Sequence, residues 1–232
     1  MSFIDSFREQ FVMTFITEQR YLLFINGLKT TLLITILSAV LGVILGFVIA
    51  YIRTTHDRIG KLRILNFICR IYLTVIRGTP TMIQLLIMYF IIFGSVKIDK
   101  VPVAILAFGL NSSAYVAEIF RSGIMSIPYG QMEAARSLGL NYVQATGRVI
   151  LPQAVKNVLP ALGNEIIVLL KETSISGYIA LQDLTKAGDI VRSRTYSPFF
   201  PYISVAAIYL IMVMILERLL GRMEARLAQS DR

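Results

Sequence analysis

Four polar or charged side chains that could bind one small ligand stand within stretches of otherwise apolar sequence. Arg77 carries a positive charge, Glu165 a negative one, and Asn111 and Ser112 offer neutral hydrogen-bonding groups. A zwitterion that leaves water needs a cation for its carboxylate, an anion for its ammonium group and neutral groups to complete both shells. These residues supply that set. The alternative is that the two charges form structural ion pairs with neighbouring helices.

The composition excludes several other kinds of chemistry. The 232 residues include one cysteine, Cys69, and one histidine, His56, so we expect no internal disulfide and no metal centre built from thiolates or imidazoles. Hydrophobic residues make up 56% of the chain and charged residues only 16%, which is typical of a membrane protein. The net charge of +9 comes from basic residues that flank apolar runs. This placement indicates membrane topology rather than nucleic-acid binding.

Long uncharged runs predict an all-α integral membrane protein with five transmembrane helices. A helix needs about 20 residues to cross the hydrocarbon core of a bilayer. The predicted spans are residues 30–52, 64–96, 101–120, 149–170 and 195–216. We expect residues 21–222 to form a single transmembrane domain. Residues 1–20 should be an outer amphipathic or disordered segment, and residues 223–232 a cytoplasmic tail.

Two other patterns predict packing rather than ligand binding. The first span carries small residues at intervals of four, which lets helix backbones approach closely in lipid. These residues are Ser38, Gly42, Gly46 and Ala50. The segment 181–194 mixes apolar and charged residues, so we expect a surface helix there rather than another span.

The distribution of Lys and Arg indicates the direction of the spans. If the loop at 52–63 is cytoplasmic, that side receives 11 basic residues and the other side 8. Because basic residues are enriched in cytoplasmic loops, the count favours an N-terminus outside and a C-terminus inside. At a rise of 1.5 Å per residue, Arg77, Asn111 and Glu165 then fall at similar depths. The sequence therefore allows these three side chains to share one site.

The residues after Arg77 predict a break in its helix. Gly78 and Thr79 precede Pro80, which cannot donate a backbone hydrogen bond, so the helix should bend or unwind here. Unwound backbone beside a cavity is one way in which transporters build polar sites at membrane depth.

Glu118 is a further candidate for ligand contact. It shares a helical face with Asn111, but it lies deeper along the same predicted span. Arg121 follows three residues later, at a spacing that suits an ion pair on a helix. A structural pair between Glu118 and Arg121 is therefore the alternative to ligand binding.

The segment 127–154, between the third and fourth spans, predicts a short helix outside the membrane. Pro128 and Gly130 mark its start, residues 131–138 are good helix formers, and Gly139 stands where a left-handed terminating residue is needed. An isolated helix of two turns is marginal in water, so we expect this one to pack on a partner.

This segment resembles the EAA loop of permease subunits of type I ABC importers, here residues 128–152. The residues that carry the motif are Glu133, Ala134, Ala135 and Gly139. VILP at 149–152 completes it, with Val149 where the family usually has Ile. Four other segments look like the polar amino-acid permease branch of the family. They are NGLKTTL at 26–32, VIRGTP at 75–80, NSSAYVAEIFRSGI at 111–124 and ALGNEIIVLLKETS at 161–174.

The resemblance implies the partners and activity of such a subunit. The EAA loop would couple this chain to a separate ATPase that binds ATP and Mg²⁺, and a second permease subunit, identical or closely related, would complete the pathway. An extracytoplasmic solute-binding protein would deliver a polar amino acid for import across a bacterial inner membrane. The chain has no Walker A motif, so we expect it to bind no cofactor and to be no enzyme. Membrane lipid would surround the spans.

Three alternative functions fit parts of the sequence. An importer of the same fold could carry methionine, a metal ion or an oxyanion, and Arg77 together with Glu165 favours a zwitterion over a pure anion. An ion channel or an ion-coupled secondary amino-acid transporter would leave the EAA loop without a partner. A membrane scaffold without transport would leave the two charges within the spans unexplained.

Overall fold

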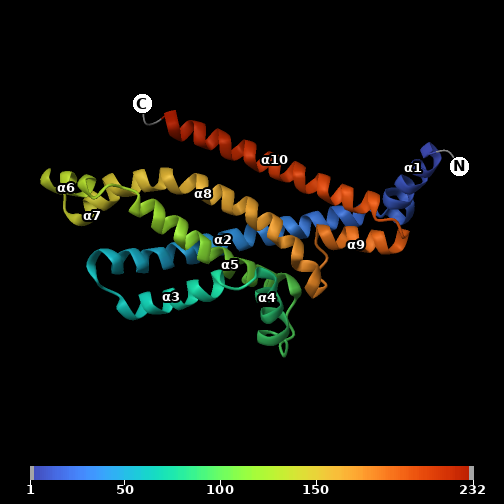
Figure 1. Cartoon of the computed structure of the whole chain (residues 1–232), viewed down its shortest axis with the longest axis horizontal. Helices are drawn as coiled ribbons and strands as arrows, with labels where there is room; N and C mark the ends of the chain where they lie inside the picture. Colours follow the sequence, from blue (N-terminus) through green and yellow to red (C-terminus); the bar gives the residue numbers. More distant parts are fainter. Residues whose placement is uncertain (1–2, 230–232) are drawn as a thin grey trace. The chain divides into compact units, whose positions relative to one another are not determined.

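The computed structural model describes residues 3–229, and every regular element in that range is a helix (Figure 1). The last residues of the predicted tail, 230–232, lie outside the described part of the chain. The α-helices are α1 (Phe3–Phe11), α2 (Tyr21–Ile59), α3 (Arg63–Arg77), α4 (Thr81–Leu86), α5 (Lys100–Met125), α6 (Tyr129–Ser137), α7 (Tyr142–Ala145), α8 (Leu151–Glu172), α9 (Leu184–Thr195) and α10 (Phe199–Gln229). Shorter 3₁₀ and π-helical segments are η1 (Val12–Ile16), η2 (Thr17–Gln19), η3 (Ile87–Ile92), η4 (Thr146–Ile150) and η5 (Thr173–Ile179). The predicted all-helical class is confirmed.

Three helices of the described chain, α2, α5 and α10, are long and apolar enough to cross a membrane. A fourth span results if α3 and the α4–η3 segment, which are separated by a short break, count as one. The fourth predicted span corresponds to α8, whose 22 residues are long enough but carry Lys156 and Glu165. The structure thus supports three or four spans by length and composition, and the count of five stays a prediction.

The chain divides into two compact units. Unit 1 comprises residues up to 38, 81–108 and 167–216, and unit 2 comprises 39–80, 109–166 and 217 onward. The long helices α2, α5, α8 and α10 contribute residues to both units.

Unit 1 is organised around the start of α9. The Asp183 carboxylate caps this helix by accepting hydrogen bonds from the backbone N–H groups of Thr185 and Lys186. Burial raises the pKa of this carboxyl group. A Cβ on Gly27 would lie 2.7 Å from the Asp183 carbonyl oxygen. Only glycine therefore lets α2 approach the backbone at the start of α9 so closely. Because Leu184 is fully buried, α9 is a packed helix rather than a solvated one, and it is too short to be a span.

Unit 2 depends on close packing of α2 against α5. A Cβ on Gly46 would lie 2.6 Å from Val116 Cγ1, and a Cβ on Gly42 would lie 3.0 Å from Ser112 Oγ. The small residues of the first predicted span therefore do pack against another helix. The Tyr72 hydroxyl of α3 donates to the Leu110 carbonyl oxygen at 2.6 Å and so ties α3 to α5 as well. These contacts set the position of the residues that follow on α3.

We predict that Gly46→Ala destabilises the purified transporter by about 1–3 kcal/mol, because its Cβ would overlap Val116. The measurement is thermal unfolding in detergent. Gly221→Ala on α10 is the matched control, since nothing lies within 4 Å of its Cβ position and alanine favours a helix. Equal stability of the two variants would contradict the packing described for α2 and α5.

Candidate functional site

The helix that carries Arg77 ends at this residue. α3 stops at Arg77 and α4 begins at Thr81, so the predicted span 64–96 is two helices rather than one continuous helix. The break falls where Gly78 and Pro80 predicted it. A Cβ on Gly78 would lie 2.6 Å from the Thr74 carbonyl oxygen, which explains why glycine occupies the end of α3.

An open cavity of about 560 Å³ lies beside this helix end, within unit 2. It is lined by Arg53, Arg70, Leu73, Thr74, Arg77, Gly78 and Tyr115. The guanidinium carbon of Arg77 stands 5.8 Å from the centre of the Tyr115 ring, within cation–π distance. The Arg77 side chain is 45% exposed. A guanidinium at the wall of an open cavity can bind an incoming carboxylate with two parallel hydrogen bonds.

Two other arginines of this cavity, Arg53 and Arg70, were not predicted from the sequence. Arg63, Arg70 and Arg77 follow one another at intervals of seven, close to two helical turns, so they share one face of α3. All three are exposed in the structure, and Arg70 and Arg77 line the cavity. The heptad spacing was the signal that could have found Arg70. Arg53, by contrast, comes from α2 and gave no local signal.

Glu118 stands at the centre of an ion-pair network. Its carboxylate lies 2.7 Å from Arg121 Nη2, 3.7 Å from Arg53 Nη1 and 3.8 Å from Arg77 Nη1. Arg121 also approaches Asp57, at 3.7 Å. The pair expected between Glu118 and Arg121 therefore forms, and two further guanidiniums from α2 and α3 share the same carboxylate. We call these five residues the Glu118 network.

The remaining ligand candidates lie together elsewhere in unit 2. Asn111 and Ser112 are buried on α5, each with 1% exposure, and the Ser112 hydroxyl donates to Glu165 Oε1 of α8 at 2.8 Å. The structure thus joins Ser112 to Glu165 and Arg77 to Glu118. α5 carries Ser112 of the first pair and Glu118 of the second.

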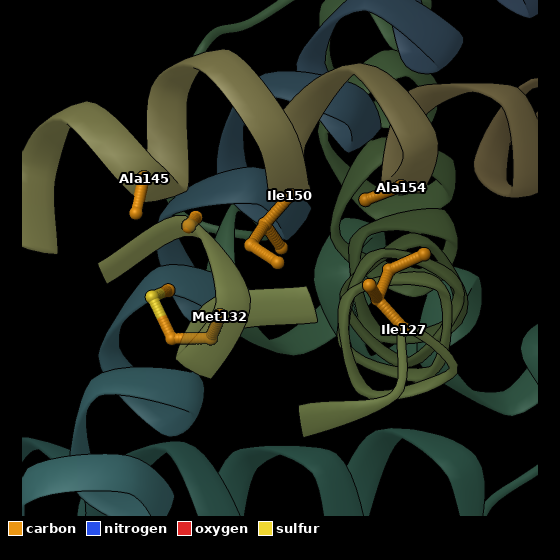
Figure 2. Close-up of a cluster of buried hydrophobic side chains, with 6 residues drawn as sticks. Ile127, Met132, Ala145, Ile150 and Ala154 are labelled. Carbon is orange, nitrogen blue, oxygen red and sulfur yellow. The ribbon is translucent and has the colours of Figure 1, made fainter. Parts of the chain in front are cut away.

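The segment after α5 forms a compact structure of its own (Figure 2). In Figure 2 the side chains of Met132 on α6, Ala145 on α7 and Ile150 on η4 converge on one buried cluster, which also contains Ile127, Ala135 and Ala154. α6 therefore obtains the packing partner that a short helix needs from the chain itself.

Gly139 ends α6 as predicted. Its φ of +89° lies in the left-handed region. The N–H of Gly139 donates to the Arg136 carbonyl and the N–H of Leu140 to the Ala135 carbonyl, which is the pairing of a Schellman motif. α7 then begins at once, with Asn141 and Gln144 forming a capping box.

The three residues of the EAA motif face in different directions. Glu133 and Ala134 are exposed, whereas Ala135 is 4% exposed and belongs to the buried cluster. Both alanines belong to the motif expected to couple this chain to an ATPase, but Ala135 faces the chain's own core. Large apolar side chains surround α6 at the surface, with Tyr129 68%, Leu138 85% and Val143 78% exposed.

Residues 42–229 match the family described as "Binding-protein-dependent transport system inner membrane component". The chain belongs to this family. It is a multi-pass inner-membrane permease subunit of a type I ABC importer. The family implies partnership with an ATPase, a second permease subunit and a binding protein, and ATP hydrolysis takes place in the separate ATPase subunit.

Several relatives are similar over most of the chain. A Rickettsia conorii permease, provisionally named GlnP for glutamine transport, is 41% identical over 162 residues, 68% of this chain and 74% of that protein. The arginine transport system permease protein ArtQ of Bacillus subtilis is 39% identical over 176 residues, 75% of this chain and 80% of that protein. The L-cystine transport system permease protein TcyB of Bacillus subtilis is 36% identical over 176 residues, 75% of each chain.

Solved structures show the same fold. A crystal structure of an amino acid ABC transporter with histidines is similar at a TM-score of 0.82 and 44% identity, over 91% of this chain and 98% of that chain. The MetNI methionine ABC transporter in an inward-facing conformation is similar at a TM-score of 0.76 and 20% identity, over 89% and 97%. The second likeness, at low identity, concerns the fold alone.

We predict that Ser112→Ala lowers the stability of the transporter by about 1.5–3 kcal/mol, because the Glu165 carboxylate loses a buried hydroxyl donor. Thermal unfolding of the purified complex measures the change. Ser122→Ala is the control on the same helix: it is exposed and bonds only its own backbone, to Ile119, so we expect a change within about 0.5 kcal/mol. A Ser112 variant as stable as the control would refute the contact with Glu165.

Proposed function

We propose that this permease imports a polar amino acid and that Arg77 binds the carboxylate of the transported molecule. The observation that carries the proposal is the exposed Arg77 guanidinium at a helix break, on the wall of a cavity lined by two more arginines. The names of the relatives, which refer to glutamine, arginine and cystine transport, support an amino acid as the substrate.

The second part of the proposed site would receive the ammonium group. Glu165 is the acidic candidate, and the hydroxyl of Ser112 already holds one of its oxygens. A carboxylate oriented in this way retains acceptor capacity for a further donor. Asn111, buried next to Ser112, supplies an amide that can donate or accept. The proposed ligand is therefore a zwitterion held at both ends.

The transport cycle that we propose is alternating access in an assembly of two permease subunits and two ATPase subunits. An extracytoplasmic solute-binding protein would deliver the amino acid on the side of the N-terminus, and the C-terminus would lie in the cytoplasm, as the count of basic residues indicates. ATP binding would change the affinity of the site by changing its conformation. Exposed apolar residues of α10, such as Ile203 and Leu210, would contact lipid.

We also propose that α6 is the coupling helix that docks on the ATPase. Glu133 and Ala134 are exposed on it, and Tyr129 and Leu138 extend apolar surface at its two ends. The buried cluster that includes Ala135 anchors α6 to α7, η4 and α8. A movement of the ATPase would thus be transmitted to α8, which carries Glu165. Gly139 would contribute by ending the helix at the edge of this surface.

For the substrate site, we predict that Arg77→Ala lowers ATP-driven amino-acid uptake about 10- to 100-fold, because a charge-assisted hydrogen-bond pair is lost. Uptake of radiolabelled glutamine, arginine and cystine into proteoliposomes with the ATPase and the binding protein measures it. Arg63→Ala is the matched control, since Arg63 shares the exposed face of α3 but does not line the cavity. Unaltered uptake by the Arg77 variant would remove this residue from the site.

For the coupling helix, we predict that Glu133→Arg lowers the amino acid transported per ATP hydrolysed roughly ten-fold while the complex still assembles, because a reversed charge would meet the ATPase surface. Parallel assays of uptake and phosphate release give this ratio. Glu224→Arg makes the same chemical change at an exposed position of α10 outside α6, and its ratio should stay at the wild-type value. Normal coupling in the Glu133 variant would rule out the assignment of α6.

A further inference from the structure

Among the residues that the structure describes, Glu118 is the carboxylate within ion-pairing distance of Arg77. The same guanidinium is the group that the proposed function assigns to the carboxylate of the substrate. Arg77 lines the cavity and also pairs with Glu118, so an anion in the cavity and the Glu118 carboxylate would compete for the same guanidinium.

We propose that Glu118 competes with the substrate for Arg77. In the empty site Glu118 would hold the guanidinium, and the carboxylate of an arriving amino acid would displace Glu118 from it. Glu118 is then a positioning residue and not a contact of the substrate. This inference rests on the proposed function, because it requires Arg77 to bind the carboxylate.

Arg77 is the partner most easily exchanged, because its side chain is more exposed than that of Arg53, at 17%, or Arg121, at 28%. Glu118 Oε1 accepts from both Nε and Nη2 of Arg121, at 3.3 and 2.7 Å, which is a two-point contact within one helix. Arg77 Nη1 lies 3.8 Å from Oε2, beyond hydrogen-bond distance, and the Arg77 side chain is 45% exposed. Exposed single-point ion pairs contribute little to stability, so a ligand can replace this one at small cost.

The other arginines of the network would still neutralise the charge of Glu118 when Arg77 binds the substrate. Arg53 lies 3.7 Å from the same Oε2 oxygen and Arg121 2.7 Å from the other oxygen. Breaking a pair in an apolar environment is costly when it leaves a charge without a partner. Here the exchange leaves Glu118 with two guanidiniums and gives Arg77 a new carboxylate. The ring of Tyr115, under the Arg77 guanidinium, remains available in both states.

Glu118→Gln tests the proposal because glutamine keeps the shape of the side chain and an acceptor for Arg121 but removes the competing charge. We expect this variant to bind the amino acid roughly three- to five-fold more tightly than the wild type, since Arg77 becomes free for the ligand. The measurement is equilibrium binding of radiolabelled glutamine, arginine and cystine to the purified permease and ATPase complex, without binding protein or nucleotide.

Three controls separate competition from a structural effect. Glu118→Asp keeps the competing charge and should bind as the wild type does. Glu224→Gln makes the same change at an exposed carboxylate of α10 outside the Glu118 network, so binding should again be unchanged. The α-carboxamide of the same amino acid lacks the negative charge, and its affinity should not differ between the wild type and Glu118→Gln.

Arg121→Gln gives an independent test of opposite sign. It weakens the hold on Glu118, which then pairs more strongly with Arg77, so amino-acid binding should weaken while carboxamide binding stays constant. If Glu118→Gln does not assemble, this variant alone tests whether Glu118 competes with the substrate for Arg77.

Unchanged or weaker amino-acid binding by an assembled Glu118→Gln complex would overturn the proposal, as would equal or tighter binding by Arg121→Gln. Failure of the proposed function has a different signature. In that case Arg77→Ala would bind the amino acid as well as the wild type, whatever the Glu118 variants show.

Discussion

The carboxylate of Glu118 is the point at which charged side chains of unit 2 meet. The guanidiniums of Arg53, Arg77 and Arg121 lie 2.7–3.8 Å from it, so that no charge of this group stands alone. The shared carboxylate draws residues from α2, α3 and α5 to one point. Gly42 and Gly46 allow the approach of α2 to α5 that this meeting requires. Helix packing and charge pairing therefore support each other.

The break after Arg77 gives this charge cluster an opening. The cavity is lined by Gly78, the first residue after α3, so a further turn of this helix would begin at the cavity wall. Glycine and proline end the helix, and the last side chain of α3 is left facing open space. α5 then serves as a common support, because it holds Glu118 near Arg77 and Ser112 near Glu165.

The region after α5 shows how a helix of nine residues is stabilised without relying on its own propensity. Gly139 ends it, Asn141 starts the next turn, and a buried cluster joins α6 to the beginning of α8. In this cluster Ala135 is a core residue, which separates its role from that of exposed Ala134. The packed cluster surrounds Ala135, whereas Ala134 lies on the open surface of α6.

Local chemistry in the sequence determined the helical class, the break at Pro80, the end of α6 at Gly139 and the spacing of Glu118 and Arg121, because each depends on residues within one or two turns. It also placed the polar candidates within apolar helices. The tertiary structure decided which of them meet. Ser112 and Glu165 are 53 positions apart, and Arg53 reaches Glu118 from another helix. Such pairings depend on the rotation and crossing of packed helices, which no local pattern specifies. For the same reason, only the fold could show that Ala135 faces inward and that Arg77 already has a partner.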